Sequence, residues 1–190
     1  MRKRWTLAEL NGMDKAAFVE ALNGIYEHSP WVLERAWERG PFFSLKDVAG
    51  ACAHAIQYSS KEEQLRLLLA HPDLGAKMVM TSDSRGEQDG AGLNRLTPLE
   101  YAEFSELNTK YVRRFGFPFI LAVKGHSKDT IRIEMRVRLV NSAEAEWERA
   151  LHEVNRIARF RLEERIFERS EGDEACGSSD GQRGGDGRRI

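Results

Sequence analysis

Apolar residues recur along most of this chain with the three- and four-residue spacing of an α-helix. The pattern predicts helices over residues 14–27, 31–39, 45–58, 60–71, 97–114 and 143–167. Two of these segments open on a capping box, SKEE at 60–63 and TPLE at 97–100, and Asp14 is a candidate N-cap for the first. We therefore expect an all-α fold, a compact domain of about eight helices.

Two segments carry a different pattern. Residues 131–137, within DTIRIEMRVRLV, alternate apolar and charged side chains as an amphipathic strand does. Residues 117–123 also suggest extended structure. Because helices surround residues 131–137 and no partner strand is evident, we predict that this segment is helical.

The composition changes near the end of the chain. From residue 170 onward Ser, Gly, Asp and Arg dominate, and almost no apolar residue is present. Such a segment buries too little surface to offset the entropy lost on ordering. We expect one folded domain over residues 1–169 and a disordered tail over residues 170–190.

Charge and hydropathy exclude several classes of partner. The 29 Lys and Arg residues nearly balance the 30 Asp and Glu residues, so no bulk charge favours nucleic acid or a membrane surface. No apolar run approaches the ~20 residues that span a bilayer, and the basic N-terminus lacks the apolar segment of a signal peptide. The two cysteines form no recognisable motif. We expect a cytoplasmic protein.

Three kinds of catalytic site find little support in the sequence. No two of the five histidines have the i, i+4 spacing of a helical zinc site, so we expect no metal. A G-x-S-x-G motif is absent, and Cys52 lies in an apolar helical stretch. The glycines of GEQDGAG, residues 86–92, follow no strand, unlike those of a phosphate-binding loop. Acid–base chemistry on a small polar molecule remains.

Four segments place unusual residues in predicted loops or at helix ends: HPDLG at 71–75, SDSRGEQ at 82–88, FGFPFI at 115–120 and RFRL at 159–162. Together they suggest a pocket. Each also has a structural interpretation that the residues alone leave open. His71 could interact with a helix C-terminus, Ser84 and Glu87 could form a capping box, the aromatic segment could be a packed turn, and Arg161 could pair with Glu164.

The ordered motifs HPDLG, S-x-x-EQ, RFGFPFILAV and NSAEAEWERALHEVNRIARFRL resemble the 2-oxo-4-hydroxy-4-carboxy-5-ureidoimidazoline (OHCU) decarboxylase family. The resemblance covers residues 6–166. It implies an all-helical enzyme without a cofactor, usually a homodimer, that converts OHCU to (S)-allantoin in the last step of urate degradation to allantoin.

The resemblance also assigns roles to individual residues. His71 matches the catalytic histidine, and Glu87 matches a substrate-binding position that is the expected second catalytic group. The remaining matches are substrate-binding positions: Pro72, Ser84, Gln88, Phe119, Ile120, Leu121, Ala122, Val123 and Arg161. The chain departs from the family pattern at Lys124, where an arginine is frequent, and it lacks a peroxisomal tripeptide, which favours a cytoplasmic protein of bacterial type.

The chemistry of this substrate fits the residue types. Its carboxylate and hydroxyl share a ring carbon next to a C=N bond, and that bond can accept the electron pair left by CO2. We therefore expect His71 to polarise or deprotonate the hydroxyl. Glu87 would position the ureido group and help to place the stereo-determining proton, and Arg161 would bind substrate oxygens.

Two alternative functions are compatible with parts of the same sequence pattern. Hydrolysis of 5-hydroxyisourate is a related step, but that activity usually resides in a transthyretin-like β domain. A non-catalytic helical interaction module would retain the same pattern of helices without the chemistry. The combination of His71 with Ser84, Glu87, Gln88 and Arg161 argues against the interaction module.

Overall fold

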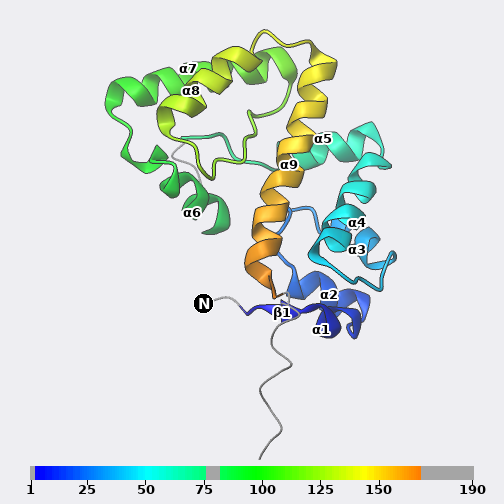
Figure 1. The fold of residues 1–190 in the computed structure, drawn as a ribbon. Helices are drawn as coiled ribbons and strands as arrows, with labels where there is room; N and C mark the ends of the chain where they lie inside the picture. The colour runs from blue at the N-terminus through cyan, green and yellow to red at the C-terminus, as the bar shows by residue number, and fades with distance from the viewer. Residues whose placement is uncertain (1–2, 76–81, 168–190) are drawn as a thin grey trace, which may run out of the picture.

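The structure is a computed structural model, and it describes residues 3–75 and 82–167. The tail predicted over residues 170–190 lies outside the described residues. Most of the described residues lie in helices, whose lengths range from 5 residues in the first to 23 in the last (Figure 1).

The described residues contain nine α-helices and one short parallel strand pair, which confirms the predicted all-α class. A 3₁₀ turn, Leu93–Arg95, follows the sixth helix. In chain order the elements are β1 Trp5–Thr6, α1 Leu7–Asn11, α2 Lys15–Ala21, α3 Trp31–Trp37, α4 Leu45–Gln57, α5 Lys61–Leu69, α6 Ser82–Gly90, α7 Pro98–Phe115, α8 Lys128–Arg138, α9 Ala143–Arg165 and β2 Ile166–Phe167.

The predicted capping boxes form as expected. Ser60 Oγ accepts the Glu63 backbone N–H at 3.2 Å, and the Glu63 carboxylate accepts the Ser60 N–H at 3.0 Å. Thr97 and Glu100 repeat this arrangement at the start of α7. These reciprocal bonds satisfy backbone donors that the helix leaves without partners, which is why the sequence signal locates both helix starts well.

The prediction for α2 was too long. The helix was predicted over residues 14–27 but ends at Ala21. Leu22, Ile25 and Tyr26 are nevertheless buried, because the chain after α2 folds back onto the core through turns. We call residues 22–30 the α2–α3 loop. Burial of an apolar residue was therefore predicted correctly where its secondary structure was not.

The alternating segment is helical, as predicted. Ser127 caps α8, and Ile131 and Met135, one helical turn apart, are buried. Ile133 and Val137 are more than half exposed. The strand-like alternation thus arises because a helix carries apolar residues on its solvent face as well as its core face.

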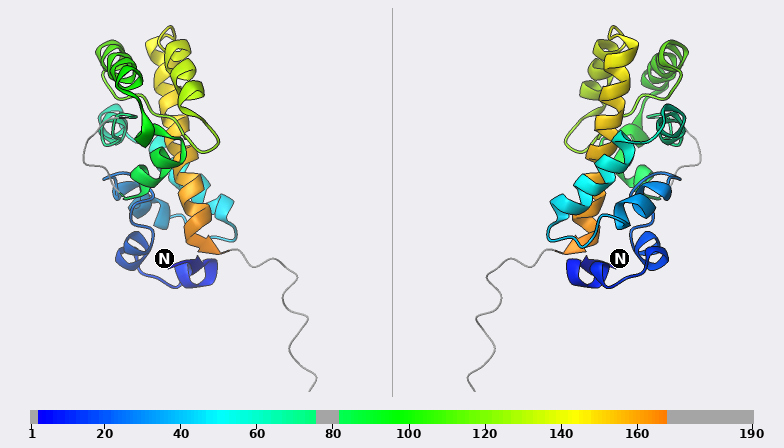
Figure 2. Two further views of the ribbon diagram at one scale, coloured as in Figure 1. Left: turned by 90° about the vertical axis from the view of Figure 1, so that its left-hand side faces the viewer. Right: turned by 90° about the vertical axis from the view of Figure 1, so that its right-hand side faces the viewer.

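Helix α9 is the axis of the fold. α4, α5 and α7 pack against it, and α7 also packs against α8. In Figure 1, α6, α7 and α8 lie on one side of α9, and α2, α3, α4 and α5 lie on the other. The strand pair aligns Trp5 with Ile166, so the first elements of the chain meet the end of α9 (Figure 2). A side chain on the C-terminal half of α9 can therefore contact both groups of helices.

Candidate active site

His71 lies just beyond the C-terminus of α5, whose C-cap is Ala70. Its ring Nδ1 is 2.9 Å from the carbonyl oxygen of Leu67, and its backbone N–H bonds to the carbonyl of Leu68. The last carbonyls of a helix have no partner within the helix, so His71 satisfies two of them. Pro72 follows and disfavours helical geometry at His71. His71 therefore does interact with the C-terminus of a helix, as one interpretation of the sequence held. The bond to Leu67 also fixes the orientation of the ring.

The environment of His71 determines its protonation state. The side chain is buried, and burial lowers its pKa from 6.5 to about 4, although the Leu67 carbonyl and the Glu27 carboxylate act in the opposite direction. At neutral pH the imidazole is therefore uncharged. Because a carbonyl can only accept, Nδ1 carries the hydrogen and Nε2 carries the lone pair. The neutral ring therefore presents Nε2 as a hydrogen-bond acceptor.

Three predicted residues share one face of α6. Ser84 and Gln88 are buried and Glu87 is partly buried. The Gln88 side-chain oxygen accepts the backbone N–H of Gly75 at 2.9 Å, which ties α6 to the segment that follows His71. α6 begins at Ser82, so Ser84 is inside the helix and the alternative of a Ser84–Glu87 capping box is wrong.

Arg161 reaches α6 from α9. Its Nε and Nη2 donate to the two oxygens of Glu87 at 2.6 and 2.8 Å, a bidentate ion pair. Nη2 also donates to Ser84 Oγ at 3.2 Å. Arg161 therefore pairs with Glu87 of α6, and not with Glu164 on its own helix. A planar guanidinium that forms two parallel bonds is oriented as well as charged.

Residues 119–123 are buried and irregular, not strand, and two charged side chains hold their backbone. Arg138 donates to the Ile120 carbonyl at 2.8 Å, and it is itself paired with buried Glu146. On the other side, Glu153 accepts the Ala122 N–H at 2.9 Å. Both anchors lie on helices, α8 and α9, so the segment is held by rigid elements.

Some backbone N–H and C=O groups near the residues bound by Arg138 and Glu153 have no hydrogen bond to the described residues. Among the hydrogen bonds that join described residues, none involves the backbone of Leu121 or the N–H of Val123. Both residues line the cavity described next. Buried backbone groups are usually paired. The segment can therefore offer donors and an acceptor to a bound polar molecule.

These residues enclose a cavity of about 30 Å³. It is lined by ten of the eleven residues predicted for the site, together with Leu74 and Ile157: His71, Pro72, Ser84, Glu87, Gln88, Phe119, Ile120, Leu121, Val123 and Arg161. Ala122 instead lines an adjoining outer pocket of about 380 Å³. The structure thus brings together residues from four separate stretches of the chain.

The outer pocket shares Glu87, Val123, Ile157 and Arg161 with the inner cavity. A volume of 380 Å³ lies in the range of small-molecule sites, whereas the inner cavity has room for a water molecule or two. Lys124 also lines the outer pocket, with its Nζ 4.9 Å from the centre of the Phe160 ring. The Glu87–Arg161 pair stands where the two spaces meet.

Glu27 is the residue that the sequence did not reveal. It lies in the α2–α3 loop, is 3% exposed, accepts a hydrogen bond from Ser84 Oγ and lies 3.1 Å from Arg161 Nη1. An acidic residue in a turn is normally solvated, so its sequence position gives no signal. Only the fold shows that it belongs to the site.

The described residues show neither a metal site nor a membrane-spanning helix. Residues 3–75 and 82–167 contain no group of three His, Cys, Asp or Glu side chains placed to hold a metal ion. Nor does this part of the chain contain a helix long and apolar enough to cross a membrane.

Comparison with known proteins agrees with the geometry. The family model described as OHCU decarboxylase matches residues 11–163. An OHCU decarboxylase from Halalkalicoccus jeotgali is 48% identical over 161 residues, which cover 85% of this chain and 92% of that protein. A uric acid degradation bifunctional protein from Bacillus subtilis is 44% identical over 88% of this chain and 34% of its own length. A crystal structure of (S)-allantoin synthase aligns with a TM-score of 0.68 at 32% identity, over 85% of this chain and 54% of that one. This chain therefore belongs to the OHCU decarboxylase family.

Proposed function

We propose that this chain decarboxylates OHCU to (S)-allantoin, the last step of urate degradation to allantoin, with His71 as the general base. The observation that carries the proposal is the buried His71, whose Nδ1 is bound to a carbonyl and whose Nε2 is left as an acceptor in a cavity beside the Glu87–Arg161 pair. A neutral imidazole of this kind can accept a hydroxyl proton.

The reaction begins at the ring carbon that carries the carboxylate and the hydroxyl. The bond from this carbon to the carboxylate breaks and releases CO2, and its electron pair moves toward the adjacent C=N bond, whose nitrogen is protonated. The hydroxyl then loses its proton to His71 Nε2 as a carbonyl forms. As this carbonyl forms, a proton is added to the neighbouring ring carbon, so the net change is the loss of CO2 and the gain of one proton. The substrate itself accepts the electron pair, so the protein has to orient groups and move protons.

The other side chains have positioning tasks in this proposal. Arg161 binds substrate oxygens with its fixed fork of donors, and Ser84 and Gln88 complete the polar wall. Glu87 orients the ureido group and guides the proton to one face of the ring carbon, which would give a single enantiomer. The backbone of residues 119–123 binds the ring, and Pro72 packs against it. The substrate is larger than the inner cavity, so it would occupy part of the outer pocket as well.

The test is an assay with the unstable substrate made in place. Urate oxidase and hydroxyisourate hydrolase convert urate to OHCU, the protein is added, and circular dichroism follows the product. Rapid appearance of (S)-allantoin is the expected result, and His71→Asn is the matched control. If allantoin forms slowly and as a racemate in the presence of the wild-type protein, as it does in spontaneous decay, the protein is not this decarboxylase. If the protein were instead a hydroxyisourate hydrolase, it would replace the added hydrolase and form OHCU when that enzyme is left out of the assay.

A homodimer in the cytoplasm is part of the same proposal, and it rests on the family resemblance. Analytical ultracentrifugation at micromolar concentration tests the assembly, with a species of about twice the 21.7 kDa chain mass expected. A species of the chain mass over the whole concentration range would rule the homodimer out.

A further inference from the structure

Arg161 uses both edges of its guanidinium, and the two edges have different partners. On one edge, Nη1 donates to the carbonyl of Gly24 at 3.0 Å and lies 3.1 Å from Glu27 Oε1. On the other edge, Nε and Nη2 hold the carboxylate of Glu87. One arginine thus lies between two carboxylates, and its donors are engaged before any substrate binds.

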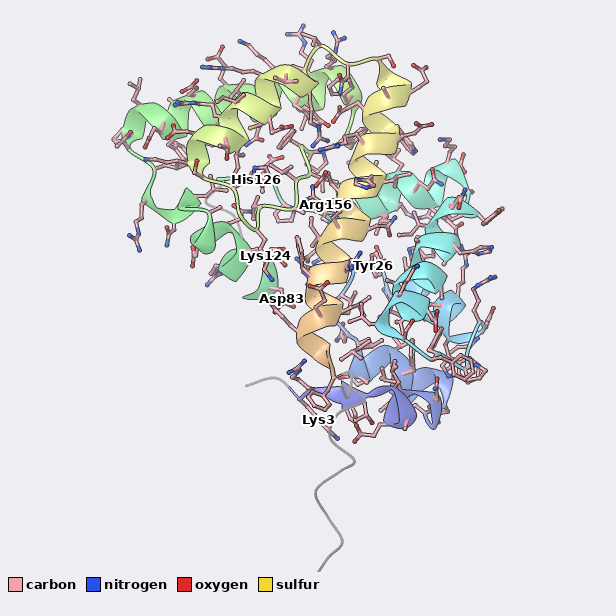
Figure 3. All side chains as sticks on the ribbon, viewed as in Figure 1. Lys3, Tyr26, Asp83, Lys124, His126 and Arg156 are labelled. Atoms are coloured by element: carbon pink, nitrogen blue, oxygen red, sulfur yellow. The ribbon has the colours of Figure 1, made fainter. Side chains whose placement is uncertain are left out.

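The two carboxylates differ in their access to solvent. The Glu27 side chain is 2% exposed, whereas that of Glu87 is 31% exposed. Glu87 borders both the inner cavity and the outer pocket, and Glu27 borders neither. In the view of Figure 3, Lys124 and Asp83 of the outer pocket lie on one side of α9, and Tyr26, next to Glu27 in sequence, lies on the other. Glu27 is therefore the fixed partner and Glu87 the one that a ligand can displace.

The surroundings of Glu27 also favour a fixed position. Ser84 Oγ donates to the same Glu27 oxygen that faces Arg161, so one carboxylate orients a residue of α6 and a residue of α9. The loop that carries Glu27 is also joined to α9 away from Arg161, through the Tyr26 hydroxyl and Asn155 at 3.3 Å and through Arg165, which donates to the Asn23 carbonyl at 3.0 Å. The bond between Tyr26 and Asn155 touches neither Arg161 nor Ser84, which makes Tyr26 a suitable control position.

We propose that Glu27 is a positioning residue, which holds Arg161 so that its Nε–Nη2 edge faces the pocket and accepts the substrate carboxylate in place of Glu87. This inference deepens the proposed function and rests on it. The resident Glu87 carboxylate already shows that the edge binds a planar pair of oxygens. With Glu27 present, Arg161 keeps a negative partner when Glu87 leaves. Without it, Glu87 is the carboxylate that still contacts the guanidinium directly, while Asp83 acts on Arg161 through its charge, so the resting pair is harder to open.

The experiment compares kcat and KM in the coupled assay for Glu27→Gln, Glu27→Ala and the control Tyr26→Phe. Glu27→Gln keeps the shape and the acceptor oxygen but removes the charge. We expect its KM to rise about tenfold, as for the loss of one charge-assisted hydrogen bond, with kcat within about threefold of the wild type. Glu27→Ala should raise KM further. Tyr26→Phe removes the hydroxyl that bonds to Asn155 and to Cys52, neither of which contacts Arg161, and it should leave KM unchanged.

Several results would overturn the inference. One is a folded Glu27→Gln protein with wild-type KM; another is an equal rise of KM in Tyr26→Phe, which would trace the effect to loosening of the loop. If Glu27→Ala does not fold, Glu27→Gln decides. An inactive wild type would refute the proposed function, and the position of Arg161 would then be read from crystal structures. The inference requires the guanidinium to leave its position beside residue 27 in Glu27→Ala, which removes the acceptor, and it fails if the guanidinium stays.

Discussion

Replacement of His71 by Asn tests the state of the imidazole in two independent ways. The Asn side-chain amide can donate to the Leu67 carbonyl, as Nδ1 does now at 2.9 Å, but it places no acceptor where Nε2 stands. The change should therefore keep the end of α5 intact while it removes the base. We expect kcat to fall at least ~100-fold, the low end for a general acid–base group.

The same substitution should alter the pH dependence of stability. The pKa of His71 is about 4 in the folded protein and 6.5 for an ordinary histidine. Between these values the unfolded chain binds more protons than the folded one, so stability falls as the pH is lowered. The loss is about 2 kcal/mol at pH 5 and about 3 kcal/mol below pH 4, relative to pH 8. At pH 5 it corresponds to a fall in Tm of about 4–8 °C.

Thermal unfolding of the wild type and His71→Asn between pH 8 and pH 5 measures this difference. The carboxylates titrate in both proteins, so only the difference between the two curves reports on His71. The wild type should lose Tm more steeply, and its kcat/KM should fall near pH 4 rather than near 6.5. Parallel Tm curves, or a fall of kcat/KM near 6.5, would show that His71 is not held neutral by burial, and the argument for Nε2 as the base would fail.

Two further predictions concern the framework of the site. Arg138→Met leaves Glu146, which is fully buried, without its cation, and should cost about 3–5 kcal/mol in urea unfolding; a loss below 1 kcal/mol would mean that the pair does not anchor residues 119–123. Gly75→Ala forces an L side chain into a φ of +73° with its Cβ 3.1 Å from Leu96 Cδ1, and should cost about 1–2 kcal/mol. Unchanged stability in the same urea experiment would contradict the strain expected at this turn.

The sequence was most informative where the physics is local. The capping boxes at Ser60 and Thr97 use bonds within four residues, so their helix starts are readable directly. The end of α2 was not readable, because Leu22 and Ile25 keep a helical spacing although the chain there forms turns. Tertiary packing decides the conformation at such positions.

The candidate site could be predicted from the sequence only in part, because some of its residues are brought in by tertiary packing. Four motifs point to His71, to the α6 residues, to residues 119–123 and to Arg161, and the structure places all of them around adjoining spaces. Glu27 has no motif, since its role depends on Arg161, which is 134 residues away in the chain. The choice of Glu87 over Glu164 as the partner of Arg161 depends on the same kind of long-range contact.

The strand pair between Trp5 and Ile166 has a consequence for how this fold can be combined with others. Entry to and exit from the described helices lie side by side, on a parallel bridge of two residues. A partner domain fused to either end would start from the same corner of the molecule, and insertion of the whole fold into a surface loop of a host would need little extra linker. A fold whose first and last strands pair in this way is suited to fusion with, or insertion into, another protein.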